Sequence, residues 1–287
     1  MRIPESELIL NKDGSVYHLN LHPEDIADVI ITVGDPDRVP QVSCYFDKIE
    51  VRKQKREFVT HTGVLNNQRI TVVSTGIGTG NIDIVMNELD ALTNIDFSTR
   101  QIKSVFKPLK IVRVGTSGTL QQDVPLDSIV VTQRAVGLES IANFYNLEFT
   151  ADEKRLMDKF LEQFENHPAI QSCYAVDASG ELVNLFGTTE TAIVGTTVTC
   201  GGFYAAQGRI LRAPLRIPDF IEKLQQLNMT NFEMETAGIY GMGKLLGHHC
   251  LSISAIVANR INKQFSKDGN ATVERLIEKS LGIVSGL

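Results

Sequence analysis

The sequence predicts an α/β protein: a single domain of three α/β/α layers, in which helices cover both faces of a mixed central sheet. Short runs rich in Val and Ile alternate with amphipathic stretches along the 287 residues. Several runs are almost continuously apolar, which is typical of strands buried on both faces. No internal repeat, low-complexity tract or long linker divides the chain, so we expect one domain over residues 1–287.

Six strands and six helices follow from these patterns. The expected strands are 29–33, 69–74, 110–114, 128–132, 192–198 and 251–258. The expected helices are 36–44, 80–93, 152–166, 218–227, 234–247 and 272–285. A further strand is expected after the charged stretch 55–58, which by itself is typical of a solvated face. Ligands of such sheets usually lie at the carboxyl ends of strands, so the residues after each strand are the first candidates for a site.

Composition restricts the class of function. The net charge of −6 argues against a general nucleic-acid surface, although a small anionic substrate still fits. The four cysteines form no CxxC pair or Cys/His cluster, and the adjacent His248 and His249 do not converge on one metal. The N-terminus is too short and polar for a secretory signal, and no run of about 18 apolar residues predicts a membrane span. We expect reduced thiols and a cytoplasmic protein.

The first expected strand ends in Gly34-Asp35-Pro36-Asp37-Arg38. Asp35 is expected to cap a helix that begins at Pro36. The free amides of that helix start, together with a glycine that admits close approach, favour an anion. An ordinary tight turn with a surface arginine fits the same residues.

Arg113 lies within an otherwise apolar strand. A buried guanidinium is costly unless it meets a carboxylate, a carbonyl or an anionic ligand. The Gly-Thr-Ser-Gly run at 115–118 offers amides and hydroxyls and is expected to form an anion nest. An arginine on an edge strand, facing solvent, is the alternative. The Gly-rich run 74–81 matches neither the dinucleotide pattern nor a Walker A loop.

Two further segments suit a sugar and a base. Glu233-Met234-Glu235 opens an expected helix, where acids either cap the helix or accept hydrogen bonds from a ribose diol. Gln207 and Arg209, two residues apart on an expected extended segment, would point the same way. An amide and a guanidinium suit the edge of uracil, which carries two carbonyls flanking an N–H. A polar loop explains the same pair.

Taken together, these segments resemble the nucleoside phosphorylase superfamily and, within it, the uridine phosphorylases. The resemblance runs in order from about residue 17 to residue 260. It rests on GDPDR (34–38), REF (56–58), STGIG (74–78), RVGTSG (113–118), FYAAQGR (203–209), EMET (233–236) and ANR (258–260). It implies the nucleoside phosphorylase fold with a partly barrel-like sheet. It also implies reversible phosphorolysis of uridine to uracil and ribose 1-phosphate in pyrimidine nucleoside salvage.

The resemblance assigns roles to individual residues. Phosphate would be held by Gly34, Arg38, Arg113, Thr116 and, from a neighbouring subunit, Arg56. The ribose would be bound by His18 of a partner subunit and by Thr116, Glu233, Met234 and Glu235. The base would be bound by Phe203, Gln207, Arg209 and Phe232. Catalysis would depend on Arg209, Gln207, Glu235 and Arg113.

The resemblance also implies partners and cofactors. The partners are uridine, phosphate and further copies of the chain in a homo-oligomer that shares sites across a dimer interface, with no nucleic acid and no membrane. No cofactor is required, because phosphate is a co-substrate. Glu57, Ile70 and Ser74 fall where some bacterial relatives bind a monovalent cation such as K⁺ between subunits.

Two departures qualify the resemblance, and one residue bears on the choice of base. Thr79-Gly80-Asn81 replaces the Pro-Ser that follows Ile77-Gly78 in many relatives, and 177–202, an expected lid region, is not diagnostic. Asn259 stands where purine enzymes of this fold place an aspartate that protonates the base, which favours a pyrimidine. A phosphorylase of broader pyrimidine specificity, a nucleosidase and a nucleoside-binding protein remain alternatives.

Overall fold

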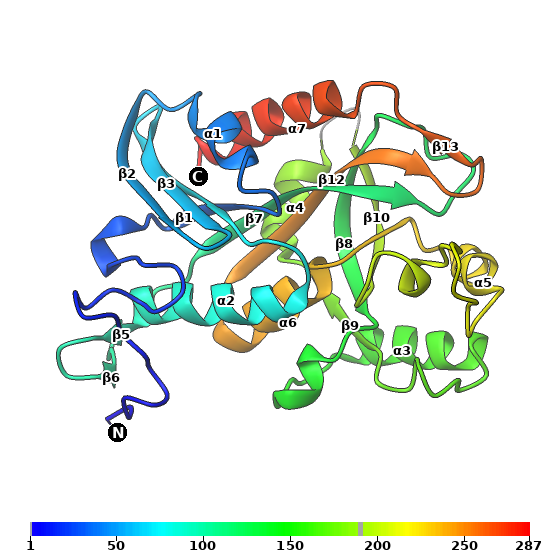
Figure 1. The fold of residues 1–287 in the computed structure, drawn as a ribbon, viewed down its shortest axis with the longest axis horizontal. Helices are drawn as coiled ribbons and strands as arrows, with labels where there is room; N and C mark the ends of the chain where they lie inside the picture. Colours follow the sequence, from blue (N-terminus) through cyan, green and yellow to red (C-terminus); the bar gives the residue numbers. More distant parts are fainter. Residues whose placement is uncertain (1, 189–191) are drawn as a thin grey trace.

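A computed structural model of the chain describes residues 2–188 and 192–287 (Figure 1). Eleven strands form one mixed sheet in the order β13-β12-β8-β10-β11-β7-β1-β4-β3-β2, with β9 paired to β8. Because β7 pairs with both β12 and β11, the strands β7, β12, β8, β10 and β11 close into a ring. The partly barrel-like mixed sheet that the resemblance implies is confirmed.

The six expected strands all form. They are β1 (Val29–Val33), β4 (Gln68–Ser74), β7 (Lys110–Thr119), β8 (Ile129–Gly137), β10 (Ala192–Thr199) and β12 (His249–Asn259). All five residues of β1 are buried, as expected of a central parallel strand. However, β7 and β8 each run five residues past their predicted ends, because neighbouring strands pair with the polar residues there.

Several strands have weaker sequence signals. The hairpin β2 (Lys48–Lys55) and β3 (Phe58–Leu65) extends one edge of the sheet, and β3 is the strand expected after 55–58. Strand β2 was not predicted, because its residues alternate between exposed and half-buried and carry many charges. The short strands are β5 (Ile95–Asp96), β6 (Gln101–Ile102), β9 (Tyr174–Asp177), β11 (Asn231–Glu233) and β13 (Gln264–Phe265).

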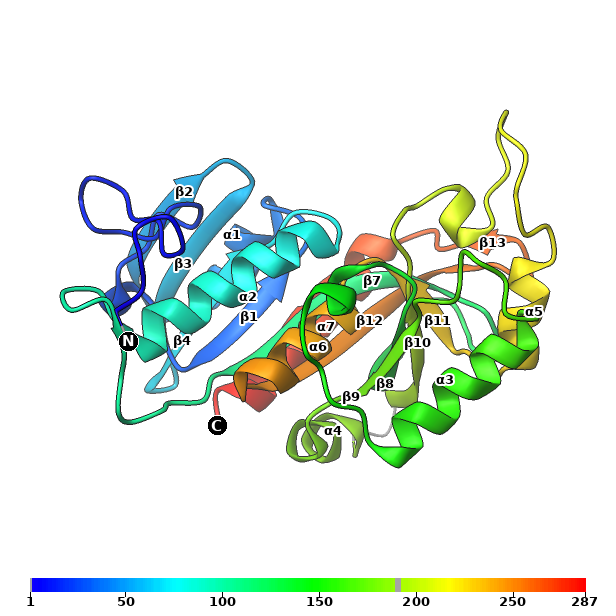
Figure 2. The same cartoon turned by 90° about the horizontal axis from the view of Figure 1, so that it is seen from below.

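Helices cover both faces of the sheet, as predicted. The long helices are α2 (Thr79–Asn94), α3 (Ala151–Gln163), α6 (Thr236–Leu246) and α7 (Gly269–Val284), and the shorter ones are α1 (Arg38–Ser43), α4 (Gly180–Gly187) and α5 (Phe220–Gln226). Figure 2 shows α2 and α6 side by side on one face, where they share an apolar core. Helices α1, α4 and α7 share a second core on the opposite face.

The expected lid segment 177–202 is part of the sheet and its helical cover. Its helix α4 packs Leu182 and Phe186 into the second core, and β10 lies between β8 and β11. The segment that borders the main cavity is instead the one after β10, which carries Phe203 and Gln207. The geometry of 177–202, which the sequence left open, is therefore that of a sheet strand and its helical cover in the described residues; residues 189–191 lie outside them.

A third apolar core joins α3 and α5 to the sheet. Phe160 of α3 is fully buried there and stacks on Phe164 at a ring-centroid distance of 5.1 Å. Phe144, in the short 3₁₀ helix Ile141–Phe144, is 82% exposed. Phe160 and Phe144 are thus the same residue type in a buried and an exposed position, so comparing them isolates the effect of burial.

We expect Phe160→Ala to lower the free energy of unfolding by about 3–5 kcal/mol, because it removes buried apolar contacts and leaves a cavity. Phe144→Ala is the control and should change it by less than about 0.5 kcal/mol. Urea denaturation followed by circular dichroism measures both values. Equal unfolding midpoints for the two variants would contradict this account of the third core.

Candidate active site

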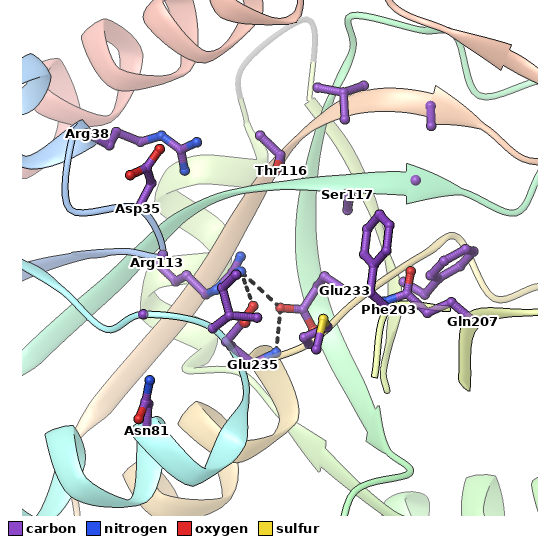
Figure 3. Close-up of a pocket in the computed structure, with 18 of the residues that line it drawn as sticks. Asp35, Arg38, Asn81, Arg113, Thr116, Ser117, Phe203, Gln207, Glu233 and Glu235 are labelled. Carbon is purple, nitrogen blue, oxygen red and sulfur yellow. Dashed lines mark hydrogen bonds and ion pairs between the residues drawn. The ribbon is translucent and has the colours of Figure 1, made fainter. Parts of the chain in front are cut away.

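A cavity of about 710 Å³ opens at the carboxyl ends of the central strands (Figure 3). Its volume is within the usual range for small-molecule sites. The walls come from the loops after β1 and β4, from β7, β12 and the end of β11, and from the segment 203–209. The predicted residues that line it are Gly34, Arg38, Arg113, Thr116, Phe203, Gln207, Arg209, Phe232, Glu233, Met234 and Glu235.

Arg113 is the buried cation at the centre of this cavity. Its Nη2 lies 3.3 Å from Glu233 and makes a shorter contact with Glu235. Burial alone would lower the pKa of Arg113, but the two carboxylates outweigh it and raise the pKa. Nη1 is buried and has no partner among the described residues. The expectation that Arg113 faces a carboxylate is confirmed, and its Nη1 leaves one donor for a ligand.

Gly115 leaves the space that the Arg113 guanidinium occupies. A Cβ built on Gly115 would overlap the Arg113 guanidinium, which lies across the strand at that position. The glycine predicted as part of an anion nest therefore serves a different purpose. Residues 115–118 belong to β7 and pair with β12, so the predicted nest does not form.

Glu233 and Glu235 differ in their contacts, and only Glu233 takes the helix-capping role that the sequence left open for both. Glu233 caps α6: its carboxylate accepts the N–H groups of Glu235 at 2.9 Å and Thr236 at 3.0 Å. It also accepts the hydroxyl of Thr199 at 2.7 Å. Glu235 instead bonds Arg113 and accepts the N–H of Gly78 at 2.7 Å. Burial and the neighbouring Glu233 raise the pKa of Glu235, while Arg113 opposes the rise.

Arg38 lies near Arg113 at the same end of the cavity (Figure 3). Burial first, and then repulsion from Arg113, lowers the pKa of Arg38. It makes no ion pair within 4.0 Å among the described residues. Two guanidinium groups that converge with unused donors form a site suited to an anion.

The loop after β1 differs from its prediction. Helix α1 begins at Arg38, two residues later than expected. The Asp35 carboxylate accepts the N–H of Asp37 at 3.0 Å, and the Asp35 carbonyl accepts that of Arg38 at 3.0 Å. Because these amides are already bonded, the start of α1 does not offer them to a ligand.

Gln207 and Arg209 meet at the other end of the cavity. The predicted extended segment is wrong: 205–207 is a 3₁₀ turn, and Gly208 follows with a φ of 64°, in the left-handed region. The turn still brings the two together, since Nη1 of Arg209 donates to Oε1 of Gln207 at 2.5 Å. The guanidinium lies 3.8 Å from the centroid of Phe203. Burial and the nearby Arg260 lower the pKa of Arg209 to about 10.

Arg260 supports this end of the cavity and was not predicted as a site residue. It donates to the carbonyl of Gln207 at 3.1 Å and lies 5.5 Å from the Phe232 ring. Asn259 beside it does not line the cavity. Its amide donates to the carbonyls of Gln121 and Val124 instead. The argument from Asn259 to a pyrimidine therefore does not rest on a contact with the base, although no Asp or Glu lines this end among the described residues.

His18 and Arg56 lie outside the cavity of their own chain. Nδ1 of His18 is 2.7 Å from Glu88, which fixes the ring. Arg56 is exposed at the tip of the β2–β3 hairpin, 6.0 Å from the ring of Tyr17. The two segments therefore share one surface patch, formed by Tyr17, His18 and Arg56.

The expected cation residues do not converge within one chain. The Ser74 hydroxyl donates to the Glu57 carbonyl at 2.5 Å and accepts the Val59 N–H at 2.7 Å. Ile70 is buried four residues earlier on β4, about 13 Å away along the strand. One chain by itself therefore does not fit such an ion.

The described residues contain neither a metal-binding cluster nor a membrane-spanning helix. No cluster of three or more His, Cys, Asp or Glu side chains could hold a metal ion in residues 2–188 and 192–287. No helix in those ranges is long and apolar enough to cross a membrane. The four cysteines are free thiols.

The cavity includes residues that sequence reasoning did not assign. These are Asp35, Pro36, Glu57 as a wall residue, Gly76, Ile77, Asn81, Val257, Ala258 and Phe265, while Ser117 and Gly118, expected in an anion nest, line the cavity from β7. Most flank the motifs already described, so proximity to those motifs was the available signal. Phe265 belongs to the short strand β13, and no pattern indicated it.

Comparisons with known proteins agree with this geometry. Residues 28–286 match the model of the phosphorylase superfamily. A uridine phosphorylase of Thermococcus kodakarensis is 27% identical over 278 residues, covering 96% of this chain and 88% of the relative. A DeoD-type purine nucleoside phosphorylase of Buchnera aphidicola is 24% identical over 270 residues, covering 93% of this chain and 98% of the relative.

Among solved structures, a Trypanosoma brucei nucleoside phosphorylase, described as showing uridine phosphorylase activity, superposes with a TM-score of 0.87 at 29% identity. The match covers 97% of this chain and 99% of that one. The family match spans the whole ring of strands and every wall of the cavity. This chain belongs to the phosphorylase superfamily.

Proposed function

We propose that this protein is a uridine phosphorylase, a pentosyltransferase that converts uridine and phosphate to uracil and ribose 1-phosphate, reversibly. The carrying observation is the layout of one cavity: Arg38 and Arg113 lie at one end and the Gln207–Arg209 pair at the other, with Glu235 between them. The uridine phosphorylase relatives of Thermococcus kodakarensis and Trypanosoma brucei support this substrate.

Phosphate is the nucleophile in this reaction. An oxygen of phosphate bonds to C1′ of the ribose while the bond from C1′ to the base nitrogen breaks, and the bonding pair leaves with the base. Arg38 and the unused Nη1 of Arg113 hold and orient the anion. Because phosphate itself supplies the nucleophile, the proposal includes no cofactor and no nucleophilic side chain. Orientation of this kind contributes several kcal/mol.

Charge develops on both halves of the nucleoside. The sugar becomes positive, as in other glycosyl transfers, and the Glu235 carboxylate lies beside the place it would occupy. The departing base becomes negative. Arg209 offers a fixed positive charge there, and its lowered pKa of about 10 still leaves it protonated at neutral pH.

We further propose a cytoplasmic homo-oligomer that shares its sites across a dimer interface. His18 and Arg56 lie on one exposed patch, away from their own cavity, and His18 is held in place by Glu88. A second copy that packs its cavity against this patch would receive a guanidinium for phosphate and an imidazole for the ribose. We also propose that the chain is one domain and that the enzyme acts in pyrimidine nucleoside salvage.

The test of the function is phosphate dependence. We expect release of uracil from uridine to require inorganic phosphate and to yield ribose 1-phosphate, with inosine and adenosine reacting at less than about 1% of that rate. The rate of base release is measured from the change in absorbance as each nucleoside is cleaved, with and without phosphate. Equal release of uracil with and without phosphate would indicate a nucleosidase. Binding of uridine without any turnover would indicate a nucleoside-binding protein. Comparable rates for thymidine would indicate broader pyrimidine specificity.

Arg209→Ala should lower kcat for uridine about 10²–10³-fold, which is the usual cost of removing one donor to a developing anion. The KM for phosphate should change by less than about twofold, because Arg209 lies at the opposite end of the cavity. Arg212→Ala is the matched control, since Arg212 is exposed on the same loop and does not line the cavity. Wild-type kinetics for Arg209→Ala would remove Arg209 as the reader of the base.

The shared site predicts complementation between inactive variants. Arg56→Ala, in a lent residue, and Arg209→Ala, in the subunit's own cavity, should each lower activity at least about tenfold. In a mixed dimer, the cavity of the Arg56→Ala subunit keeps its own Arg209 and receives an intact Arg56 from its partner, so mixing should restore up to about a quarter of wild-type activity. Subunit exchange is verified independently by mass spectrometry of the mixed dimer. Proven exchange without recovery would exclude the shared site.

A further inference from the structure

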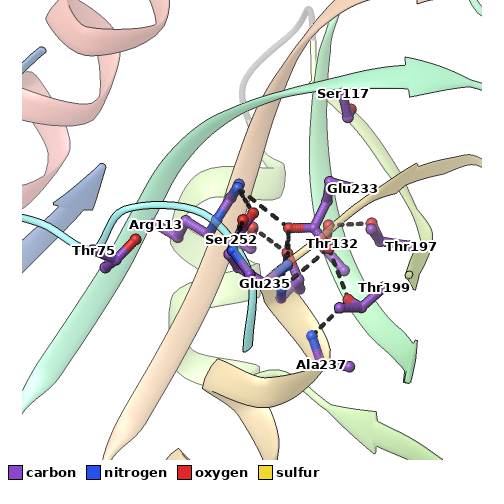
Figure 4. Close-up of polar contacts among 12 residues, drawn as sticks. Thr75, Arg113, Ser117, Thr132, Thr197, Thr199, Glu233, Glu235, Ala237 and Ser252 are labelled. Atoms are coloured by element: carbon purple, nitrogen blue, oxygen red, sulfur yellow. Dashed lines mark hydrogen bonds and ion pairs between the residues drawn. The ribbon is translucent and has the colours of Figure 1, made fainter. Parts of the chain in front are cut away.

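A line of buried polar side chains crosses the closed ring of strands and ends at the cavity wall. Thr132 of β8 and Thr197 of β10 share a hydrogen bond of 2.6 Å between their hydroxyls (Figure 4). Thr197 then donates to Oδ1 of Asn231, on β11, at 2.8 Å. Nδ2 of Asn231 donates to Oγ of Ser117, on β7, at 2.8 Å. We call these four residues the hydroxyl–amide chain.

The hydroxyl–amide chain is shielded from solvent except at its last member. Thr132, Thr197 and Asn231 are fully buried, whereas Ser117 lines the cavity. The Asn231 amide gives the chain its direction toward the cavity, because Oδ1 accepts from Thr197 and Nδ2 donates to Ser117. Its direction makes the Ser117 oxygen an acceptor. The hydroxyl hydrogen of Ser117 has no acceptor among the described residues and is free to donate into the cavity.

Ser117 lies between the two ends of the proposed substrate. It follows Thr116, assigned to the phosphate end, and precedes Gly118, which pairs with Phe232 at the base end. Its partner Asn231 stands two residues before Glu233. A donor at this place faces the region of the glycosidic bond, which joins the sugar to the base.

We propose that Ser117 is a catalytic residue that donates a hydrogen bond to the nucleoside base beside the glycosidic bond, and that Asn231 is its positioning residue. The inference rests on the proposed function. The acceptor is a ring carbonyl next to the glycosidic nitrogen, which gains negative charge as the bonding pair leaves with the base. Such a hydrogen bond strengthens in the transition state and therefore raises kcat as well as affinity.

Ser117→Ala removes the donor with little change in volume. We expect uridine to bind at least about threefold more weakly, and kcat to fall about 10- to 100-fold, which is the usual effect of losing a hydrogen bond to a charged group. The KM for phosphate should stay within about twofold. Ser117→Thr keeps the hydroxyl and should stay within about fivefold of wild-type kcat. Kinetics and calorimetric uridine titration give these values.

Ser254→Ala is the matched control. Ser254 is a fully buried serine on the neighbouring strand β12, paired in register with Gly115, and it does not line the cavity. Its hydroxyl has no hydrogen-bond partner among the described residues, so its removal should leave kcat unchanged. A comparable fall in both variants would assign the effect to the ring of strands and overturn the proposed role of Ser117.

A double-mutant cycle tests Asn231. If Asn231 acts through Ser117, Asn231→Ala lowers kcat in the wild-type background but causes no further loss when Ser117 is already Ala. Thr197→Val, which breaks the preceding link, should show the same dependence on Ser117 and keeps the test available if Asn231→Ala fails to fold. Equal losses in both backgrounds would overturn the positioning role.

The outcomes separate this inference from the function on which it rests. Absence of phosphate-dependent uracil release by the wild-type enzyme overturns the proposed function. Equal calorimetric affinity of wild type and Ser117→Ala for uridine overturns the Ser117 contact, whether or not the enzyme turns over. A wild-type kcat for Ser117→Ala, with turnover present, overturns its catalytic role.

Discussion

The buried ion pair of Arg113 with Glu233 and Glu235 is the interaction on which the rest of the site depends. It joins β7 to the β11–α6 connection, and through Glu235 it also holds the amide of Gly78 at the start of α2. Removing one partner of such a group leaves an uncompensated buried charge, whereas an apolar replacement of the whole group is often neutral or stabilising. Stability alone therefore does not explain its presence. The proposed function gives a reason, because a bound anion would pair with Nη1 of Arg113, which has no partner among the described residues.

The same ion pair gives the cavity an ordered sequence of charge. Arg38 and Arg113 line one end, Arg209 lines the other with Arg260 near it, and the Glu235 carboxylate lies between the two ends. A reaction that makes a sugar positive between an incoming anion and an outgoing anion requires this order. Burial first, and then the like charge at each end, lowers the pKa values of Arg38 and Arg209, which is the cost of placing these groups together before any ligand binds. Electrostatic preorganisation of this kind costs no rearrangement during the reaction.

The sequence predicted the parts of the fold that depend on local pattern. Runs of Val and Ile located six strands, and the buried position of Arg113 followed from its apolar neighbours. It did not predict the ends of β7, since the polar run 115–118 reads as a loop until β12 and β11 supply its pairing partners. The prediction that Gln207 and Arg209 lie together was confirmed, but the extended segment on which it depended was wrong. A 3₁₀ turn and the left-handed Gly208 bring the two side chains together. For Asn259 the expected position was not informative. Its place in the ANR motif indicated the base, but its side-chain amide donates to the Gln121 carbonyl in a neighbouring loop.

The closure of the ring explains why some site residues are precise and others are adaptable. Arg113, Ser117 and Glu233 stand on strands that have neighbours on both sides, so the register of the ladder fixes where each side chain points. Residues on such elements are held more accurately than residues on loops. The base end, by contrast, is carried by the irregular segment 203–209, and the patch of His18 and Arg56 lies on a terminal loop and a hairpin tip. Loops tolerate substitution better than the strands they connect. In the proposed enzyme, the residues for phosphate and sugar are therefore fixed by the ring, while the residues proposed to choose the base and to meet a second subunit lie in the segments that vary more freely around it.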